Sequence, residues 1–333
     1  MEIKFLKAGT GDSTLIHHKG YNIIIDGGSD SKYLLSEIDE IYKNKEIINL
    51  LIITHHDDDH IKGIIDLLKH IDENKYNLRN KFIEKVIFNS PRLVLGKISK
   101  KESNLLSYKQ AFEVEELLIK INTEWKLHKE GDTQNFEDLK IEILSPTHND
   151  LENYSLQHGA YLTSDNKCDW KTSLYLLDKY INDDSQDTSI SNKSSIVINL
   201  ECDCKKVLLL GDVTPDRLEV IMNKLSFKNK GKPNKFDLIK LPHHGSYRSL
   251  NKKIFENIIC NNYVISTNGR KYYLPNKRTL LKVLKYSQRS NNQIINFLFN
   301  YDETLNNLEV TDTELDNYNF KLIPNNKNYG ISF

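Results

Sequence analysis

Residues 50–68 read Leu-Leu-Ile-Ile-Thr-His-His-Asp-Asp-Asp-His-Ile-Lys-Gly-Ile-Ile-Asp-Leu-Leu, and this stretch decides the fold. Its first four residues are apolar, and such a short apolar run predicts a buried β-strand. The spacing of the apolar residues from Ile61 onward predicts a helix. Residues 54–60, called here the His/Asp loop, therefore form a tight strand-to-helix connection that can direct several side chains at one point.

The His/Asp loop concentrates the side chains that bind divalent cations. Imidazole nitrogens and carboxylate oxygens are usual metal ligands, and crowded carboxylates repel one another unless a cation neutralises them. A solvated acidic loop is the alternative, and it would suffice for Asp57, Asp58 and Asp59 alone. The histidines at both ends of these aspartates, and the buried strand before them, favour a metal site.

Length and composition set outer bounds on the protein. Its 333 residues suffice for one large domain or two ordinary ones. The 46 basic and 46 acidic residues cancel, so any case for nucleic-acid binding must rest on local basic loops. No apolar run approaches the length of a membrane span, and the first residues predict a strand rather than a signal peptide. We therefore expect a cytoplasmic protein that makes no membrane contact, with four cysteines that are free thiols.

Two further strand ends carry metal-binding residue types. Asp212 follows an apolar run at 207–210, and a capping or turn role is the alternative for it. His243 and His244 follow the predicted strand 236–241 and precede Gly-Ser; a pair of surface turn histidines is the alternative there. Like the His/Asp loop, both positions follow a predicted apolar strand.

Five short motifs, taken together, resemble the metallo-β-lactamase fold. In chain order they are Gly11-Asp12-Ser13, Asp26-Gly27-Gly28, His55-x-Asp57-x-Asp59-His60, Gly211-Asp212 and His243-His244-Gly245-Ser246. The aspartate at the second ligand position resembles the ComEC family, the competence proteins of DNA uptake, and its soluble relatives. The resemblance implies an α/β fold, an αββα sandwich. It covers residues 1–290 as one domain, with a probable insertion at 147–190 and a C-terminal extension, 291–333, packed on the same domain.

The resemblance also implies a dinuclear metal site. The implied ligands are His55 and Asp57 for one metal, Asp59, His60 and either His243 or His244 for the other, and Asp212 as the bridge. Asp59 and Asp212 are expected to act in catalysis, and Asp26 to orient a ligand histidine. The histidine that usually completes the first metal has no clear counterpart, although Asn192 and Ser194 lie near that point of the chain.

The implied cofactors are two divalent metal ions, Mn²⁺ or Zn²⁺. Asp57 in place of an imidazole makes the site harder and more anionic, which favours Mn²⁺ more than a histidine-rich site would. Two neighbouring metals lower the pKa of a bridging water, and the hydroxide formed can attack phosphorus or a carbonyl carbon. The sequence therefore predicts a metallo-hydrolase.

The expected activity is that of a phosphodiesterase or nuclease acting on DNA. The candidate substrate-binding residues are basic and lie in two loops: Lys228, Lys230, Lys232 and Lys235, then Arg270 and Lys271. Solvated surface is the alternative for such loops. Two other functions stay open: hydrolysis of a small lactone, thioester or phosphoester, and a metal-stabilised, non-catalytic subunit whose protein partners dock on 147–190 and the C-terminal extension.

Overall fold

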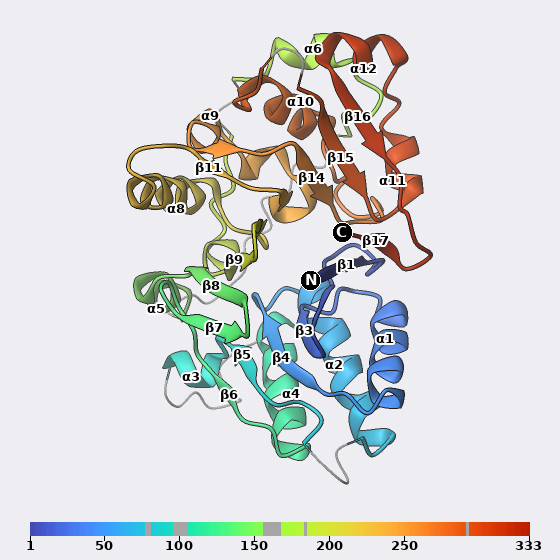
Figure 1. Cartoon of the computed structure of the whole chain (residues 1–333), viewed down its shortest axis with the longest axis vertical. Coiled ribbons are helices and arrows are strands. Elements are labelled where there is room, and N and C mark those ends of the chain that lie inside the picture. Colours follow the sequence, from blue (N-terminus) through green and yellow to red (C-terminus); the bar gives the residue numbers. More distant parts are fainter. Residues whose placement is uncertain (77–80, 96–105, 156–167, 183–184, 291–292) are drawn as a thin grey trace.

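Two β-sheets packed face to face form the centre of the computed structural model, with helices on the outer side of each (Figure 1). The structure describes residues 1–76, 81–95, 106–155, 168–182, 185–290 and 293–333. The αββα sandwich expected from the sequence is confirmed.

The first sheet is built mainly from the N-terminal third of the chain. Its order is β17 (Gly330–Ser332), β1 (Glu2–Leu6), β2 (Thr14–His18), β3 (Tyr21–Ile25), β4 (Ile48–Ile53), β5 (Val86–Phe88) and β6 (Trp125–Lys126). Helices α1 (Lys32–Lys43), α2 (Asp58–Glu73), α3 (Pro91–Leu95) and α4 (Leu106–Lys120) accompany it. The buried side chains of α1, α2 and α4 and the outer side of the sheet share one apolar cluster.

The second sheet comes from the rest of the chain. Its order is β16 (Phe320–Ile323), β15 (Ile295–Phe299), β14 (Asn262–Ile265), β12 (Leu238–Lys240), β10 (Lys205–Leu209), β9 (Val197–Cys202), β8 (Leu139–Ser145) and β7 (Thr133–Phe136). A short pair, β11 (Asn234–Lys235) and β13 (Ile258–Ile259), lies apart from it. Its larger helices are α8 (Pro215–Lys228) and α10 (Lys277–Tyr286), and the shorter ones are α5 (His148–Ser155), α6 (Leu174–Asp178), α7 (Ile190–Lys193), η1 (Pro242–Gly245), η2 (Tyr247–Ser249), α9 (Lys252–Phe255), α11 (Asp302–Asn307) and α12 (Asp312–Tyr318).

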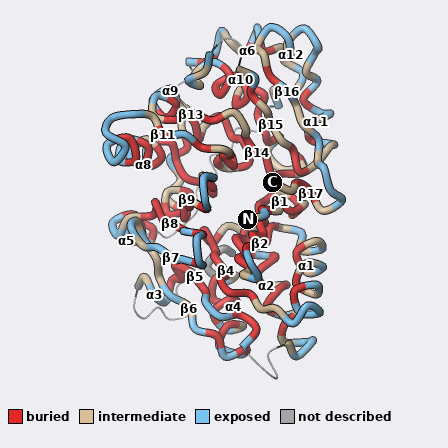
Figure 2. Tube along the Cα trace, viewed as in Figure 1, coloured by how far each residue is buried: buried red, intermediate tan, exposed pale blue. Residues whose placement is uncertain are grey.

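The position of strand β4 in the sandwich explains why its sequence is apolar throughout. Leu50 and Ile52 belong to the cluster between the two sheets, whereas Leu51 and Ile53 face the helices. Both faces of the strand are buried, so its apolar run is continuous rather than alternating. Figure 2 shows the same burial along the middle of both sheets.

Parallel strands bring the sequence motifs to one edge. Strands β3, β4 and β5 are parallel neighbours in the first sheet, and β10, β12 and β14 are parallel neighbours in the second. Asp26 and the His/Asp loop directly follow β3 and β4, and Asp212 and His243 lie three residues after the ends of β10 and β12. The contacts described below join the ends of both sheets at a single site.

Some element boundaries differ from the sequence prediction. Helix α2 begins at Asp58 rather than near Ile61, so the last aspartates of the His/Asp loop form its first turn, where carboxylates suit the positive end of the helix dipole. The C-terminal extension contains α11 and α12. Residues 293–333 also supply β15 and β16 to the second sheet and β17 to the first. None of the helices in the described ranges is long and apolar enough to cross a membrane.

A close backbone contact fixes helix α2 against the turn after β3. A Cβ on Gly63 would lie 2.0 Å from the Gly27 carbonyl oxygen, and Gly63 N donates to Gly28 O at 2.9 Å. An alanine in a helix normally gains about 1 kcal/mol over glycine. Here the backbone cannot yield, so overpacking outweighs that gain.

We therefore expect Gly63→Ala to lower the free energy of unfolding by roughly 1–3 kcal/mol. Denaturant titration of the purified variant measures this change. The exposed Lys62, next to Gly63 on the same helix, gives the control Lys62→Ala, for which a change within about 0.5 kcal/mol is expected. A Gly63→Ala protein as stable as the parent would show that the helix and turn can separate.

Candidate metal centre

Asp26, at the end of β3, organises the His/Asp loop from behind. One carboxylate oxygen accepts the Thr54 backbone N–H at 2.8 Å, and the other accepts the Thr54 hydroxyl at 2.6 Å and His60 Nδ1 at 2.8 Å. All three residues are buried. The Thr54 hydroxyl, having donated its proton to Asp26, accepts from His55 Nδ1 at 3.0 Å. Asp26 thus orients His60 directly and His55 through Thr54.

Four histidines share one arrangement around Asp212. An outside oxygen holds Nδ1 in each ring: Thr54 Oγ1 for His55, Asp26 for His60, Asp187 for His243 at 3.1 Å, and the Ser266 carbonyl for His244 at 3.1 Å. Each Nε2 then lies near a carboxylate oxygen of Asp212: 3.8 Å for His55, 3.3 Å for His60, 4.0 Å for His243 and 3.6 Å for His244. A neutral ring whose Nδ1 carries the proton presents the Nε2 lone pair to a metal.

The aspartates of the His/Asp loop join this centre from two sides. His55 Nε2 lies 3.7 Å from Asp57 Oδ2, and His244 Nε2 lies 3.6 Å from Asp59 Oδ2. Asp58 points elsewhere and accepts a hydrogen bond from Gln110 at 2.6 Å. The structure therefore brings together every metal-ligating residue that the sequence suggested, including both His243 and His244.

Several buried polar atoms of the centre have no hydrogen-bond partner among the described residues. They are His55 Nε2, His60 Nε2, His244 Nε2, Asp212 Oδ1 and Asp12 Oδ1. Each such atom costs about 1–3 kcal/mol if it stays unpaired. Nitrogen lone pairs and carboxylate oxygens converging on one place suit a divalent cation, so these residues fit a metal centre.

The charges of the centre shift one another's pKa values. Burial alone would raise the pKa of Asp212, but the imidazoles of His60, His244 and His243 outweigh it and hold that pKa well below its usual range. Burial lowers the pKa of His243, yet Asp212 and Asp187 raise it to about 9. Without a metal the ring would hold a proton at neutral pH, so metal binding must displace protons and weakens as pH falls.

A buried ion pair lies directly beneath the centre. Lys240 Nζ contacts Asp12 Oδ2, and the other Asp12 oxygen lies 3.4 Å from His244 Nδ1. Burial raises the pKa of Asp12, but Lys240 and His244 outweigh it and keep the carboxylate ionised. Sequence reasoning missed both residues as parts of the site. A lysine inside the buried strand Leu238–Lys240 was the available signal, because buried lysines are nearly always paired.

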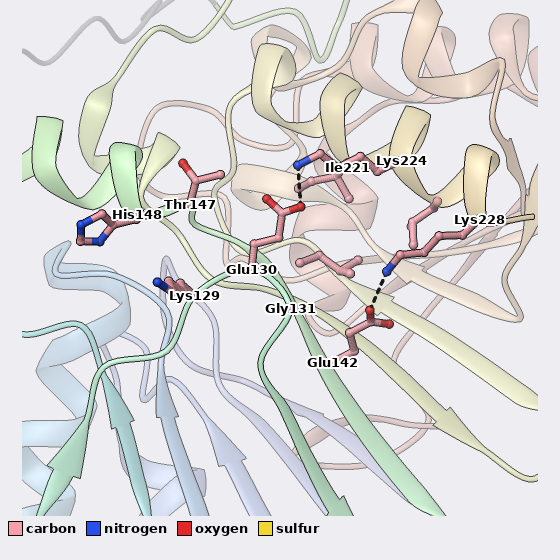
Figure 3. A pocket seen from close by; sticks show the side chains of 11 residues that line it. Lys129, Glu130, Gly131, Glu142, Thr147, His148, Ile221, Lys224 and Lys228 are labelled. Carbon is pink, nitrogen blue, oxygen red and sulfur yellow. Dashed lines mark hydrogen bonds and ion pairs between the residues drawn. The ribbon is translucent and has the colours of Figure 1, made fainter.

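The four lysines of the first basic loop are not brought to the centre. Helix α8 starts three residues after Asp212 and runs 14 residues, about 20 Å, to Lys228. Lys230, Lys232 and Lys235 then lead to the start of β12, whose other end carries the histidines. Figure 3 shows Lys228 bonded to Glu142, at 3.1 Å, in a hollow also lined by Glu130 and Lys224. Their assignment to substrate binding stays a prediction.

Lys271, from the second basic loop, is near enough to the His/Asp loop for its carboxylates to act on the ammonium group. It is half-buried, and burial by itself lowers its pKa. The carboxylates of Asp59, Asp58 and Asp57 outweigh this effect and raise the pKa of Lys271. Its side chain is therefore a positively charged ammonium group near the His/Asp loop. Arg270 beside it is exposed.

Comparison with known proteins agrees with this architecture. Residues 6–83, which carry the first three motifs, match the family model of the metallo-beta-lactamase superfamily. With the two-sheet sandwich described above, this match identifies the fold as that of the metallo-β-lactamase superfamily. No curated protein matches the sequence.

Several solved structures are similar to this chain. YhfI from Bacillus subtilis is 8% identical over 100% of this chain and 98% of its own, with a TM-score of 0.46. Zn²⁺-bound PqqB from Methylobacterium extorquens is 9% identical over 100% and 99%, with a TM-score of 0.47. CmlA, a diiron β-hydroxylase from Streptomyces venezuelae, is 11% identical over 100% and 53%, with a TM-score of 0.43.

Replacing Asp26 by asparagine tests whether the histidines depend on their outer partners. An amide N–H facing His60 Nδ1 would force the ring proton onto Nε2, where it blocks a metal. We expect Asp26→Asn to weaken metal affinity roughly 10- to 100-fold, measured by competition with a coloured chelator. Asp39→Asn is the matched control, because Asp39 pairs with His70 at 2.6 Å in a carboxylate–histidine pair outside the centre. Equal affinities for all three proteins would contradict the role given to Asp26.

Proposed function

We propose that this protein is a metal-dependent phosphodiesterase, and that its leading substrate is DNA. The observation that carries the proposal is the convergence of four imidazoles on Asp212. Lys271, whose pKa the carboxylates of the His/Asp loop raise, supports it. An ammonium group has no lone pair for a metal and instead attracts an anion. A phosphodiester placed between Lys271 and the centre would meet a positive charge on both sides.

The residues of the centre would hold two divalent ions, Mn²⁺ or Zn²⁺. When bound, such ions activate a water and stabilise the negative charge that develops on the substrate. Asp212, with its carboxylate near all four Nε2 atoms, is the group that can reach both ions. Asp26 fixes the ring proton of His60 on Nδ1 directly, and that of His55 through Thr54, so Nε2 of each neutral ring would be the nitrogen offered to a metal.

The surroundings of Lys271 support a substrate that carries bases. The Tyr273 side chain is 45% exposed, and its ring lies 5.9 Å from that of Trp170 at nearly a right angle. Trp170 is fixed by a 2.8 Å hydrogen bond from its indole to the Pro275 carbonyl. Exposed aromatic rings beside a basic group are the usual means of binding single-stranded nucleic acid. The aspartate at the second ligand position of the His/Asp loop, which resembles the ComEC family, supports the same substrate.

An activity panel tests the reaction class. We expect turnover of single- or double-stranded DNA, or of a generic aryl phosphodiester, with Mn²⁺ or Zn²⁺, and none after Asp212→Ala. Glu219→Gln on helix α8 should retain activity, and circular dichroism checks that both variants fold. RNA, a lactone and a thioester complete the panel. Faster turnover of the lactone or thioester would indicate a small-molecule hydrolase, and a metal-loaded protein inert on every substrate would indicate a non-catalytic subunit.

The two basic loops can be told apart by salt dependence. Lys271→Gln should raise KM for DNA roughly tenfold, since a hydrogen bond to a charged group contributes about 1.5–3 kcal/mol. It should also reduce the slope of log affinity against log salt by roughly 0.7–0.9. The comparison is the quadruple glutamine variant of Lys228, Lys230, Lys232 and Lys235. If only that variant changed the slope, the substrate would follow the far end of α8 and the role of Lys271 would be wrong.

A further inference from the structure

We propose that the two adjacent histidines serve different metals: His243 completes the first metal group with His55 and Asp57, and His244 belongs to the second with Asp59 and His60. We further infer that Asp187 is the residue that positions His243. The inference rests on the proposed metal-dependent function, and it supplies the third histidine that the sequence lacks at the usual place.

His244 lies beside Asp59. Its Nε2 lies 3.6 Å from Asp59 Oδ2, and its ring centre lies 5.3 Å from that of His60. Its Nδ1 is held by the Ser266 carbonyl and lies near Asp12. The side chain is 2% exposed. Asp59, His60 and His244 therefore give the second group three donors before Asp212 is counted.

One short segment contacts both His243 and Asp57. Asp187 Oδ2 accepts from His243 Nδ1 at 3.1 Å, and Asn192 Nδ2 donates to the same Asp187 oxygen at 2.7 Å. The neighbouring Ser191 hydroxyl donates to Asp57 Oδ1 at 2.8 Å. Because Ser191 and Asn192 are consecutive in helix α7, the segment that secures Asp57 also secures His243.

The backbone turn explains how neighbouring residues reach two sides. His243 and His244 adopt left-handed conformations, with φ of 47° and 53°. Each such residue costs about 1–2 kcal/mol when it is not glycine, and such strain is concentrated at functional sites. The two ring planes cross at 77° with their centres 6.0 Å apart, yet both Nε2 atoms approach Asp212 Oδ2. The rings therefore approach one bridging oxygen from different directions.

The two groups then use the same chemistry. Asp187 and His243 on one side repeat the pairing of Asp26 and His60 on the other: a buried carboxylate accepts from Nδ1 and leaves Nε2 for the metal. The His243 side chain is 27% exposed, whereas His60 is fully buried. The first group is consequently the one that opens toward solvent and substrate.

Metal content of variant pairs tests the assignment. We expect the parent protein to retain about two equivalents of Mn²⁺ or Zn²⁺ after desalting, and His243→Ala and His244→Ala to retain one each. In the His243→Ala background, Asp57→Ala should remove nothing more, whereas Asp59→Ala should remove the remaining equivalent. The His244→Ala background should show the reverse. His56→Gln is the matched control, because His56 bonds to Tyr154 and the Asn89 carbonyl and should leave two equivalents.

Asp187→Asn keeps the shape of the side chain and tests positioning without removing a ligand. We expect it to weaken one of the two metal equivalents roughly 10- to 100-fold and to leave the other unchanged, with an altered visible spectrum of the Co²⁺-loaded protein. A residue that merely supported the fold would lower the melting temperature and leave both affinities and the spectrum unchanged, and that outcome would overturn the role of Asp187.

The assignment of the histidines fails if His243→Ala keeps both equivalents, or if the two backgrounds respond alike to the second substitution. This failure is distinct from failure of the proposed function. A protein whose variants show the expected metal contents but that hydrolyses no phosphodiester would keep the assignment and lose the function.

Discussion

The structure depends on the enclosure of one carboxylate, that of Asp212, by four imidazoles. A buried charge of this kind is tolerated only where opposite charge or donors surround it. The surrounding rings come from two stretches far apart in the chain, and parallel strands of two sheets deliver them to one edge. This convergence of the four rings depends on the sandwich, on the turns after its strands and on the hydrogen bonds that hold Nδ1 of each ring.

Much of this could be read from the sequence because it is written in local patterns. The continuous apolar run at 50–53 reports a strand buried on both faces, and the polar residues that follow it report a site at its end. Asp212, His243 and His244 were found by the same reasoning. The five motifs, in order, then fixed the architecture, and the ligand-type residues they contain do meet in the structure.

The parts of the site that could not be predicted depend on contacts between residues far apart in the sequence, which leave no local pattern. Asp187 lies in a polar stretch rich in similar residues, and only its hydrogen bond to His243 distinguishes it. The first basic loop looked attached to the site because it precedes the histidine strand in sequence. The loop leads to the start of β12, however, whereas the histidines follow its other end. The length of helix α8 further separates Lys228 from Asp212. Proximity along the chain therefore does not by itself bring these lysines to the metal centre, and their assignment to substrate binding stays a prediction.

The pairing of β17 with β1 has a consequence for how the molecule is made. Lys4 stands opposite Ser332, so the outer edge of β1 is closed by a strand from the opposite end of the sequence. An open strand edge is a template for pairing with other chains. Until β17 is synthesised, that edge of the first sheet stays open.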